Sequence, residues 1–174
     1  MITIISGTNR TDSKSRKIAN YYSKILATMD QESKIIDLCD LPTKFLFSAM
    51  YHNAGKDKEF NIFKENINQS SKFIFIVPEY NGSFPGVLKA FIDGLDYKSS
   101  FNNKKCILVG ISAGNMAGAL ALSHLTDILN YMGMHVHAIK TRLPLINTLL
   151  VNDIITDKFL ENLIVTQLKA FLEF

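Results

Sequence analysis

The chain has 174 residues, of which 47% are hydrophobic and 20% are charged, and its formal net charge at pH 7 is +3. These values are typical of one globular domain that buries a substantial core. They disfavour nucleic-acid-binding and membrane-spanning proteins, because the Lys and Arg residues are dispersed and no apolar run approaches membrane length.

The first predicted element is a strand over Met1–Ser6, and a loop rich in hydroxyl groups follows it. Apolar residues at helical spacing from Ile18 to Met29 predict the first helix. The intervening stretch, SGTNRTDSKS, contains five Ser or Thr residues and Arg10. Hydroxyl groups, the unpaired N–H groups of a helix start and a guanidinium together favour an anion. An ordinary N-cap is the alternative interpretation, but a cap needs only one such side chain.

This first loop lacks both the Gly-Lys-Ser/Thr ending of a Walker A motif and a Gly-x-Gly-x-x-Gly pattern. These differences disfavour the usual sites for nucleoside triphosphates and dinucleotides. We therefore predict that the first loop binds a terminal monophosphate.

The second predicted strand, Lys34–Leu38, leads into a less regular segment, residues 39–56. Its apolar stretch Phe45–Tyr51 allows two interpretations: packing beneath the edge of the sheet, or an exposed lid or subunit contact. Both interpretations stay open at this point. Apolar residues between Phe60 and Ile67 then predict an amphipathic helix.

The segment from Phe73 to Asp96 is the one around which the rest of the chain is organised. Its β-branched and aromatic run, Phe73–Val77, predicts a strand buried on both faces of a parallel sheet. Its second half, Val87–Leu95, has an apolar stripe at helical spacing. The second loop, PEYNGSFPG, is rich in turn residues and follows the carboxyl end of a strand, where open α/β sheets bind ligands. We predict that it holds a flat polar cofactor.

The fourth predicted strand is Lys104–Ile111, and a third loop of small residues follows it. Small residues allow the backbone to approach a ligand or a neighbouring helix closely. Helix packing alone explains the Gly and Ala residues at 118–121, but it explains the stretch Ser112–Asn115 less well. A helix over residues 120–129 then ends near Gly133.

The last third of the chain contains a fifth predicted strand, Met134–Ala138, and a terminal helix over residues 159–172. The segment between them, 141–152, is predicted to be irregular. His135 and His137 point to the same face of the fifth strand. Because no third ligand is near them in the sequence, we predict no metal site.

Five strands that alternate with five helices predict an α/β fold, a flavodoxin-like three-layer sandwich. Right-handed crossovers favour a five-stranded parallel sheet in the order 2-1-3-4-5 with helices on both faces. The carboxyl ends of strands one, three and four then converge, and the three unusual loops meet there. No linker or repeat divides the chain, so we expect a single domain over residues 1–174.

Two further features bear on the class of protein. The chain begins with a strand and shows no signal peptide, so we expect a cytoplasmic protein. Cys39 and Cys106 have no Cys-x-x-Cys partner, so neither a redox motif nor a zinc motif is present.

Three motifs resemble those of the NAD(P)H-dependent FMN reductase family, a flavodoxin-like family that includes FMN-dependent quinone, azo and chromate reductases. The stretch GTNRTDSKSRKIA resembles the family's phosphate loop, Gly-Ser-x-Arg-x-x-Ser-x-Asn, with Ser15 where Asn is usual. The stretch PEYNGSFPGVLKAFID resembles the most specific signature almost residue for residue, although Gly94 stands where an aromatic residue often follows the Asp. The stretch SAGNMAGALA resembles the third, glycine-rich loop more loosely.

The resemblance implies a non-covalently bound FMN, with its phosphate on the first loop and its ring against the second. The third loop would flank the far side of the ring. The implied cofactor-binding residues are Thr8, Arg10, Ser13, Ser15, Pro78, Glu79, Tyr80, Asn81, Gly82, Ser112, Ala113, Gly114 and Asn115.

By the same resemblance, the flavin carries the chemistry and no side chain of the protein is catalytic. NADPH or NADH gives a hydride to the flavin and leaves, and a flavin, quinone, azo compound or similar small acceptor then takes the electrons in a ping-pong cycle. The family implies a homodimer or homotetramer, with Phe45–Tyr51 and the helix after Pro85 as candidates for the contact. We expect neither a nucleic acid nor a membrane as a partner.

Two alternatives stay open. A flavodoxin-type electron carrier would bind FMN and pass electrons to a protein partner, but such carriers are typically acidic and this chain is mildly basic. A degenerate relative would bind no flavin, and the intact first and second loops argue against it.

Overall fold

A six-stranded parallel sheet forms the centre of the computed structural model, which describes residues 1–97 and 99–174. The strand order is β2-β1-β3-β4-β5, and β6 pairs with the second half of β4. This order confirms the predicted flavodoxin-like α/β fold. The strands are β1 (Ile2–Ser6), β2 (Ser33–Asp37), β3 (Lys72–Pro78), β4 (Lys105–Ile111), β5 (His135–Val136) and β6 (Thr141–Leu143).

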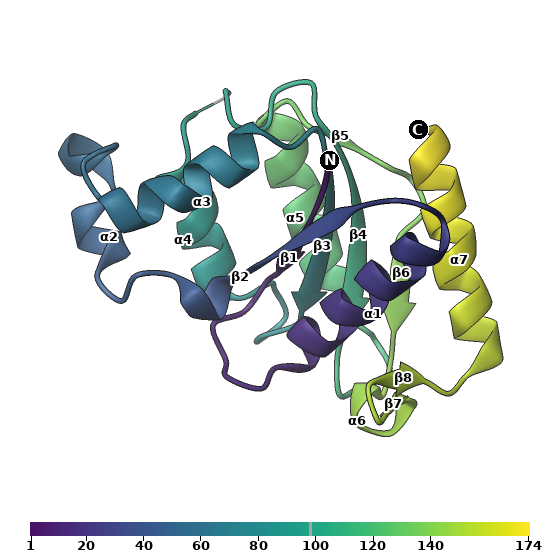
Figure 1. Cartoon of the computed structure of the whole chain (residues 1–174). Coiled ribbons are helices and arrows are strands. Elements are labelled where there is room, and N and C mark those ends of the chain that lie inside the picture. The colour runs from purple at the N-terminus through teal and green to yellow at the C-terminus, as the bar shows by residue number, and fades with distance from the viewer. Residues whose placement is uncertain (98) are drawn as a thin grey trace.

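Helices cover both faces of the sheet, as Figure 1 shows. They are α1 (Lys14–Thr28), α2 (Phe45–Ser48), α3 (Lys58–Asn68), α4 (Gly86–Gly94), α5 (Ala119–Tyr131), α6 (Ile146–Leu149) and α7 (Lys158–Glu173). Helices α1 and α7 pack on one face, and α3, α4 and α5 pack on the other. The short elements are the 3-10 helices η1 (Leu38–Asp40) and η2 (Tyr51–Asn53) and an antiparallel hairpin of β7 (Leu150–Val151) and β8 (Ile154–Ile155).

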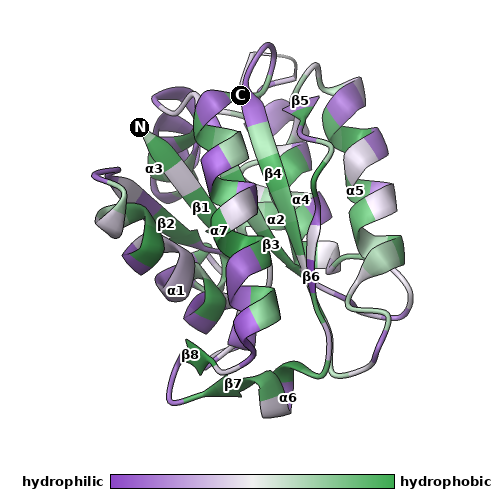
Figure 2. Cartoon of the chain, turned by 90° about the vertical axis from the view of Figure 1, so that its right-hand side faces the viewer, coloured by the Kyte–Doolittle hydropathy of each residue, from purple (hydrophilic) through white to green (hydrophobic). Residues whose placement is uncertain are grey.

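Side chains of β3 alternate between the two cores of the sandwich. Phe73, Phe75 and Val77 pack toward α3, α4 and α5, whereas Ile74 and Ile76 pack toward α1 and α7. All five are fully buried, as the apolar run predicts. Figure 2 shows the hydrophobic strands between helices that carry hydrophilic residues on their outer faces. Burial of each such side chain contributes about 1.5–3 kcal/mol, so β3 is a rigid support for the loop that follows it.

The N-terminal end of α3 is capped by a carboxylate. Asp57 accepts hydrogen bonds from the backbone N–H groups of Glu59 (3.1 Å) and Phe60 (3.0 Å) and from the hydroxyl of Ser48. The bond from Ser48, followed by the backbone bond from Phe60, lowers the pKa of the Asp57 carboxyl. The cap therefore also attaches α2 to α3.

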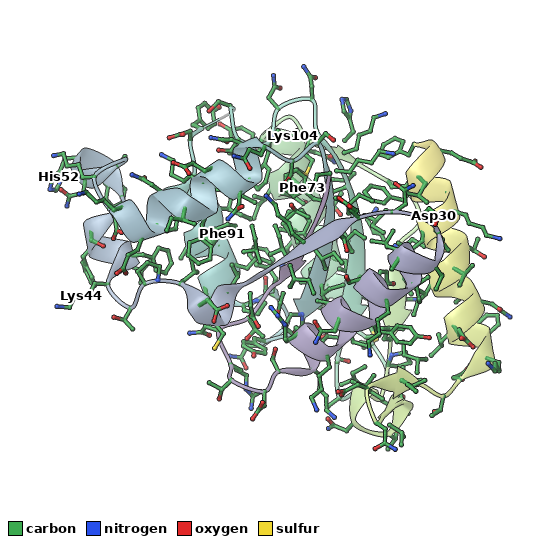
Figure 3. All side chains as sticks on the ribbon, viewed as in Figure 1. Asp30, Lys44, His52, Phe73, Phe91 and Lys104 are labelled. Carbon is green, nitrogen blue, oxygen red and sulfur yellow. The ribbon has the colours of Figure 1, made fainter. Side chains whose placement is uncertain are left out.

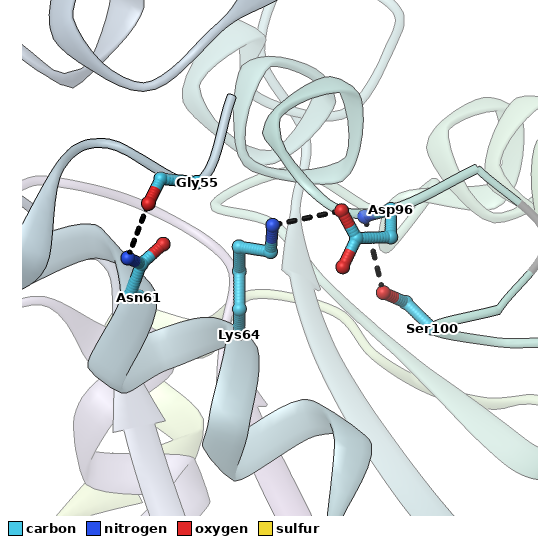
Figure 4. A network of polar contacts seen from close by, with 5 residues as sticks. All are labelled: Gly55, Asn61, Lys64, Asp96 and Ser100. Carbon is cyan, nitrogen blue, oxygen red and sulfur yellow. Dashed lines mark hydrogen bonds and ion pairs between the residues drawn. The ribbon is translucent and has the colours of Figure 1, made fainter. Parts of the chain in front are cut away.

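A polar network attaches α3 to the turn after α4 (Figure 4). The Lys64 ammonium lies 2.7 Å from the Asp96 carboxylate, and the backbone N–H of Asp96 donates to Ser100 Oγ at 3.2 Å. At the other end of α3, Asn61 donates to the carbonyl oxygen of Gly55 at 2.8 Å. The Lys64–Asp96 ion pair holds α3 beside the end of α4, and the Asn61 hydrogen bond fastens the start of α3 to the loop before it.

Phe60 of α3 fills the space next to Gly94 of α4. Its ring stacks on Phe45 at a centroid distance of 5.4 Å and meets the edge of Phe91 at 6.1 Å. Figure 3 shows Phe91 pointing into the interior of the molecule. A Cβ atom on Gly94 would lie 2.6 Å from Phe60 Cζ. An aromatic side chain at position 94, as the family pattern leads us to expect, is thus sterically incompatible with Phe60.

The apolar segment Phe45–Tyr51 is partly core and partly exposed surface. Phe45 and Met50 are buried in the core, whereas 83% of Phe47 and 87% of Tyr51 are exposed. The nearby Lys44 and His52 side chains project outward (Figure 3). Packing beneath the sheet edge therefore accounts for half of the segment, and the exposed half is available for contacts.

The edge of the sheet beyond β4 differs from the prediction. The expected strand over residues 134–138 is reduced to β5, and the segment 141–152, predicted to be irregular, contains β6, α6 and β7. The prediction was wrong at both places. His137 gives a physical reason, because its Nδ1 accepts a hydrogen bond from the backbone N–H of Ile139 (3.1 Å) and its ring packs on Phe174. The chain leaves the sheet there and returns to it as β6.

Both chain termini lie at the amino ends of the strands (Figure 1). Lys72 donates from Nζ to the carbonyl oxygens of Phe171 (3.0 Å) and Leu172 (2.8 Å) near the end of α7. Lys105 donates to the carbonyl oxygen of Phe174. Cations stabilise the carbonyl end of a helix, so these two lysines fix the end of α7 against the sheet.

Candidate functional site

A cavity of about 400 Å³ lies where the carboxyl ends of β1, β3 and β4 meet. Its walls come from the three loops that follow these strands and from α6. The volume is in the usual range for small-molecule sites. The lining residues are Thr8, Arg10, Thr11, Asp12, Ser13, Lys14, Ser15, Pro78, Glu79, Tyr80, Ile111, Ser112, Ala113, Ile146 and Asn147.

The first loop is held against β3 at its start and ends in a helix cap. The backbone N–H of Gly7 donates to the carbonyl oxygen of Ile76 at 2.9 Å, and a Cβ atom on Gly7 would lie only 2.8 Å from that oxygen. At the other end, Ser13 Oγ accepts a hydrogen bond from the backbone N–H of Arg16 at 3.1 Å. The capping role of Ser13 is thus real, and the first two residues of α1 line the cavity.

The first loop brings two cations to the cavity. Within residues 1–97 and 99–174, neither Arg10 nor Lys14 forms an ion pair. Asp12 is the acidic side chain of the same loop, and its backbone has a left-handed φ of 50°. Two unpaired cations beside a helix N-terminus favour an anionic ligand group.

A hydrogen bond joins the first loop to the second. Thr8 Oγ1 lies 2.6 Å from the hydroxyl of Tyr80, and Thr8 is buried. The guanidinium of Arg10 lies 6.0 Å from the centre of the Tyr80 ring, at the limit of a cation–π contact. The Thr8 hydroxyl is thus already engaged within the protein, and Tyr80 fixes the distance between the two loops.

The second loop closes in a tight turn. Tyr80 and Ser83 exchange both backbone hydrogen bonds, at 2.7 and 3.1 Å. Asn81 and Gly82 between them have φ values of 51° and 78°, as a type I′ turn requires. The hydroxyl of Ser83 lies 3.0 Å from Nδ1 of His124 on α5. This turn orients the residues before it, Pro78 to Tyr80, toward the cavity.

The third loop folds back tightly on the end of β4. A Cβ atom on Gly110 would lie 2.3 Å from the carbonyl oxygen of Ala117, so a glycine is needed there. Ser112 donates from Oγ to the carbonyl oxygen of Gly114 at 2.8 Å. Ser112 and Ala113 line the cavity as a result.

Most of the residues expected to bind the cofactor lie around this one cavity. The exceptions are Asn81, Gly82, Gly114 and Asn115, which belong to the second and third loops but not to the lining. The cavity also contains residues that the sequence analysis did not name as cofactor-binding, namely Thr11, Asp12, Lys14, Ile111, Ile146 and Asn147. The first four adjoin recognised motifs, so a rule that took whole loops would have found them. The last two come from α6, which is too short to have a periodic signal.

The thiol of Cys39 lies outside this cavity. Cys39 borders a second cavity of about 570 Å³ beside the first loop. Partial burial and the carboxylates of Asp37, Asp40 and Asp12 raise the pKa of the Cys39 thiol, which disfavours thiolate chemistry at neutral pH. In the described part of the chain, no group of three or more His, Cys, Asp or Glu side chains could hold a metal ion.

Comparison with known proteins identifies the family. The family model described as NADPH-dependent FMN reductase matches residues 1–140, which include all three loops. A 2-hydroxy-1,4-benzoquinone reductase from a Burkholderia species is 30% identical over 134 residues, which are 75% of this chain and 70% of that protein. An FMN-dependent NADPH-azoreductase from Staphylococcus aureus is 32% identical over 129 residues, which are 72% of this chain and 66% of that protein.

A solved structure has the same fold over nearly the whole chain. The flavoenzyme NAD(P)H:(acceptor) oxidoreductase FerB from Paracoccus denitrificans has a TM-score of 0.82 at 23% identity, covering 99% of this chain and 94% of that one. No helix among the described residues has the length and apolar character needed to cross a membrane. On the family match and the three loops, the chain belongs to the NADPH-dependent FMN reductase family and is an FMN-dependent NAD(P)H oxidoreductase.

Proposed function

We propose that FMN binds in the 400 Å³ cavity and that the chain reduces a small conjugated acceptor of the quinone or azo class. The observation that carries the proposal is the convergence of the first and second loops on one cavity. Arg10 and Tyr80 meet there, although 69 residues of sequence separate them (11–79). The phosphate of FMN would lie on the first loop, and its ring would lie between the second and third loops.

The residues present suit such a ligand. Arg10 and Lys14 supply positive charge where the phosphate would lie, and the N-terminal turn of α1 supplies backbone N–H groups. The backbone N–H groups of Glu79 and Tyr80 already donate to Ile111 and Ser83, so the carbonyl oxygen of Glu79 is the group that would accept a hydrogen bond from the polar edge of the ring. Asn81, Gly82, Gly114 and Asn115 would act by shaping the second and third loops.

FMN, when bound, supplies the hydride transfer in both halves of the reaction. The protein binds and orients, and no side chain is assigned a proton transfer. The hydrogen bond between Thr8 and Tyr80 keeps the loops for the phosphate and for the ring at a fixed separation. A reduced acceptor and oxidised NADH or NADPH are the products of the ping-pong cycle.

The names of the relatives support the acceptor class. One relative is a reductase of a hydroxylated benzoquinone, and another is an azoreductase. Quinones and azo compounds are both planar and conjugated, so they can stack on a flavin ring. We therefore favour a quinone as the first acceptor to assay.

One experiment tests this proposal directly. The purified chain is titrated with FMN in the visible range, and NADH or NADPH is then added without oxygen, followed by a benzoquinone. We expect flavin absorbance that bleaches with one or both nucleotides and returns with the quinone. Bound flavin that neither nucleotide bleaches would favour an electron carrier, and absence of flavin binding would overturn the site.

We also propose that the protein is a cytoplasmic homodimer or homotetramer and that it has no nucleic-acid or membrane partner. The exposed side chains of Phe47 and Tyr51 support self-association, because aromatic residues at 83% and 87% exposure favour burial in a contact. The cytoplasmic location stays a prediction from the sequence.

A further inference from the structure

One wall of the cavity is built by a segment outside the residues that the family model matches. The model ends at residue 140, whereas Ile146 and Asn147 of α6 line the cavity. Figure 1 shows α6 and the β7–β8 hairpin at the end of the sheet toward which the arrowheads of β3 and β6 point. This wall therefore adds two lining residues that lie outside the three loops.

Backbone hydrogen bonds attach α6 to the third loop. The N–H of Ile146 donates to the carbonyl oxygen of Ser112 at 3.0 Å, and the N–H of Leu145 donates to that of Gly114 at 3.3 Å. Leu145 has φ 47° and ψ 41°, a left-handed conformation that is unfavourable for leucine. The surrounding contacts evidently impose it, and conformations of this kind concentrate at functional sites.

The other side of the segment is attached to α1. Leu149, Leu150 and Ile155 are buried in the same core as Ile18 of α1. Lys17 of α1 forms an ion pair of 3.3 Å with the hairpin. The position of α6 is therefore set by the third loop on one side and by α1, the helix that follows the first loop, on the other.

Asn147 is the polar side chain that α6 brings to the cavity. It is exposed, so its amide is accessible to a ligand, unlike the buried Ile146 beside it. Ser15 also lines the cavity; it stands where the family pattern has an asparagine, and it is buried. A short, buried hydroxyl cannot reach as far as an amide, so position 15 of this chain supplies no amide donor.

We propose that Asn147 binds the phosphate end of FMN and supplies from α6 the amide donor that position 15 lacks. The inference rests on the proposed placement of FMN in this cavity. It makes Asn147 a binding residue that lies outside all three recognised motifs. An amide donor to a charged phosphate oxygen forms a strong hydrogen bond, so its loss weakens binding measurably.

The test compares two ligands that differ only in the phosphate. Dissociation constants of FMN and riboflavin are measured for the full chain and for N147A by the quenching of flavin fluorescence. We expect N147A to bind FMN about tenfold more weakly, as the loss of one charge-assisted hydrogen bond predicts, and to bind riboflavin as the parent chain does. N147D should weaken FMN further, because its carboxylate repels the phosphate.

An exposed asparagine on α7, Asn162, provides the matched control, and N162A should leave both dissociation constants unchanged. FMN binding by N147A within twofold of the parent chain overturns the inference alone. Equal weakening for FMN and riboflavin also overturns it, because the contact would then involve the ring or the ribityl chain. A parent chain that binds no FMN overturns the proposed function as well.

Discussion

At the scale of single residues, Arg10 is the side chain on which the phosphate assignment depends most. It lines the cavity and has no ion-pair partner within the described residues. We expect Arg10→Ala to weaken FMN binding by about 1–3 kcal/mol, because a charge-assisted contact to the phosphate is lost. A fluorescence titration of the variant measures this change.

The control for Arg10 is Arg142, an exposed arginine on β6 that does not line the cavity. Arg142→Ala removes the same charge from the molecule and should leave FMN affinity nearly unchanged at moderate salt. Equal losses for the two variants would mean that Arg10 acts only through the net charge. If Arg10→Ala binds FMN with unchanged affinity, Arg10 is a solvated surface residue and does not bind the phosphate.

A sequence motif can predict that a residue lies at the cavity, but it does not predict which side chain that residue contacts. Arg10, Ser13 and Tyr80 were named from the sequence and lie at the cavity, because a loop between fixed strand and helix ends has little freedom. The partner of Thr8 was not foreseen. Its hydroxyl bonds to Tyr80, and such a contact depends on the distance between two strands rather than on either motif.

At the scale of elements, the packing of α3 on α4 depends on a glycine. A Cβ atom on Gly94 would meet the Phe60 ring at 2.6 Å, and that ring is enclosed by other aromatic side chains and cannot move aside. We expect Gly94→Ala to lower the free energy of unfolding by about 1–3 kcal/mol through overpacking. Urea unfolding of the parent chain and of Gly94→Ala measures this difference in the free energy of unfolding.

Gly86, at the start of the same helix, is the matched control. A Cβ atom there meets nothing within 4 Å, so Gly86→Ala should be neutral or stabilise by about 0.4–1 kcal/mol through the unfolded state. Combining Gly94→Ala with Phe60→Leu should cost less than the sum of the two single changes, since the smaller side chain removes the clash. Additive losses would contradict the steric explanation.

The cap of α3 predicts a dependence of stability on pH. The folded-state pKa of Asp57 is lowered, first by the bond from Ser48, so its stabilising effect is present above the ordinary aspartate range near about pH 4. That effect is lost as the pH falls through the lower folded-state value. Ser48→Ala removes the main cause, so we expect it to lose less stability than the parent chain between about pH 5 and 3.

Guanidinium unfolding at several pH values measures this difference. Parallel stability curves for the parent chain and Ser48→Ala would show that the Ser48 hydroxyl does not influence Asp57. At this scale α3 and α4 were predictable from the sequence, because each has more than two turns of periodic apolar residues. It missed β6 and α6, whose three or four residues are set by packing on β4 and α1 rather than by local pattern.

At the scale of the whole molecule, self-association is the property to measure. Phe47 projects from the α2 segment with 83% of its surface exposed. If this surface joins two subunits, Phe47→Asp should shift the chain to monomer at micromolar concentration, because it places a charge in an apolar contact. Sedimentation velocity distinguishes the two states.

Phe159 on α7, with 69% exposure, is the matched control, and Phe159→Asp should leave the oligomeric state unchanged. A parent chain that sediments only as a monomer would remove the interface hypothesis.

The order of the sheet was predictable from the sequence, because alternating strands and helices with right-handed crossovers leave few arrangements. No sequence pattern indicates which exposed aromatic residues meet a partner.

The position of the two termini has a practical consequence for handling this protein. Met1 is more than half exposed at the amino ends of the strands, whereas Phe174 is held by Lys105 at the same end. A linker fused before Met1 would therefore leave α7 undisturbed and would point away from the cavity. A chain attached through that linker to an electrode or a resin would present the carboxyl ends of its strands, and with them the cavity, to the solution in which nucleotides and acceptors diffuse.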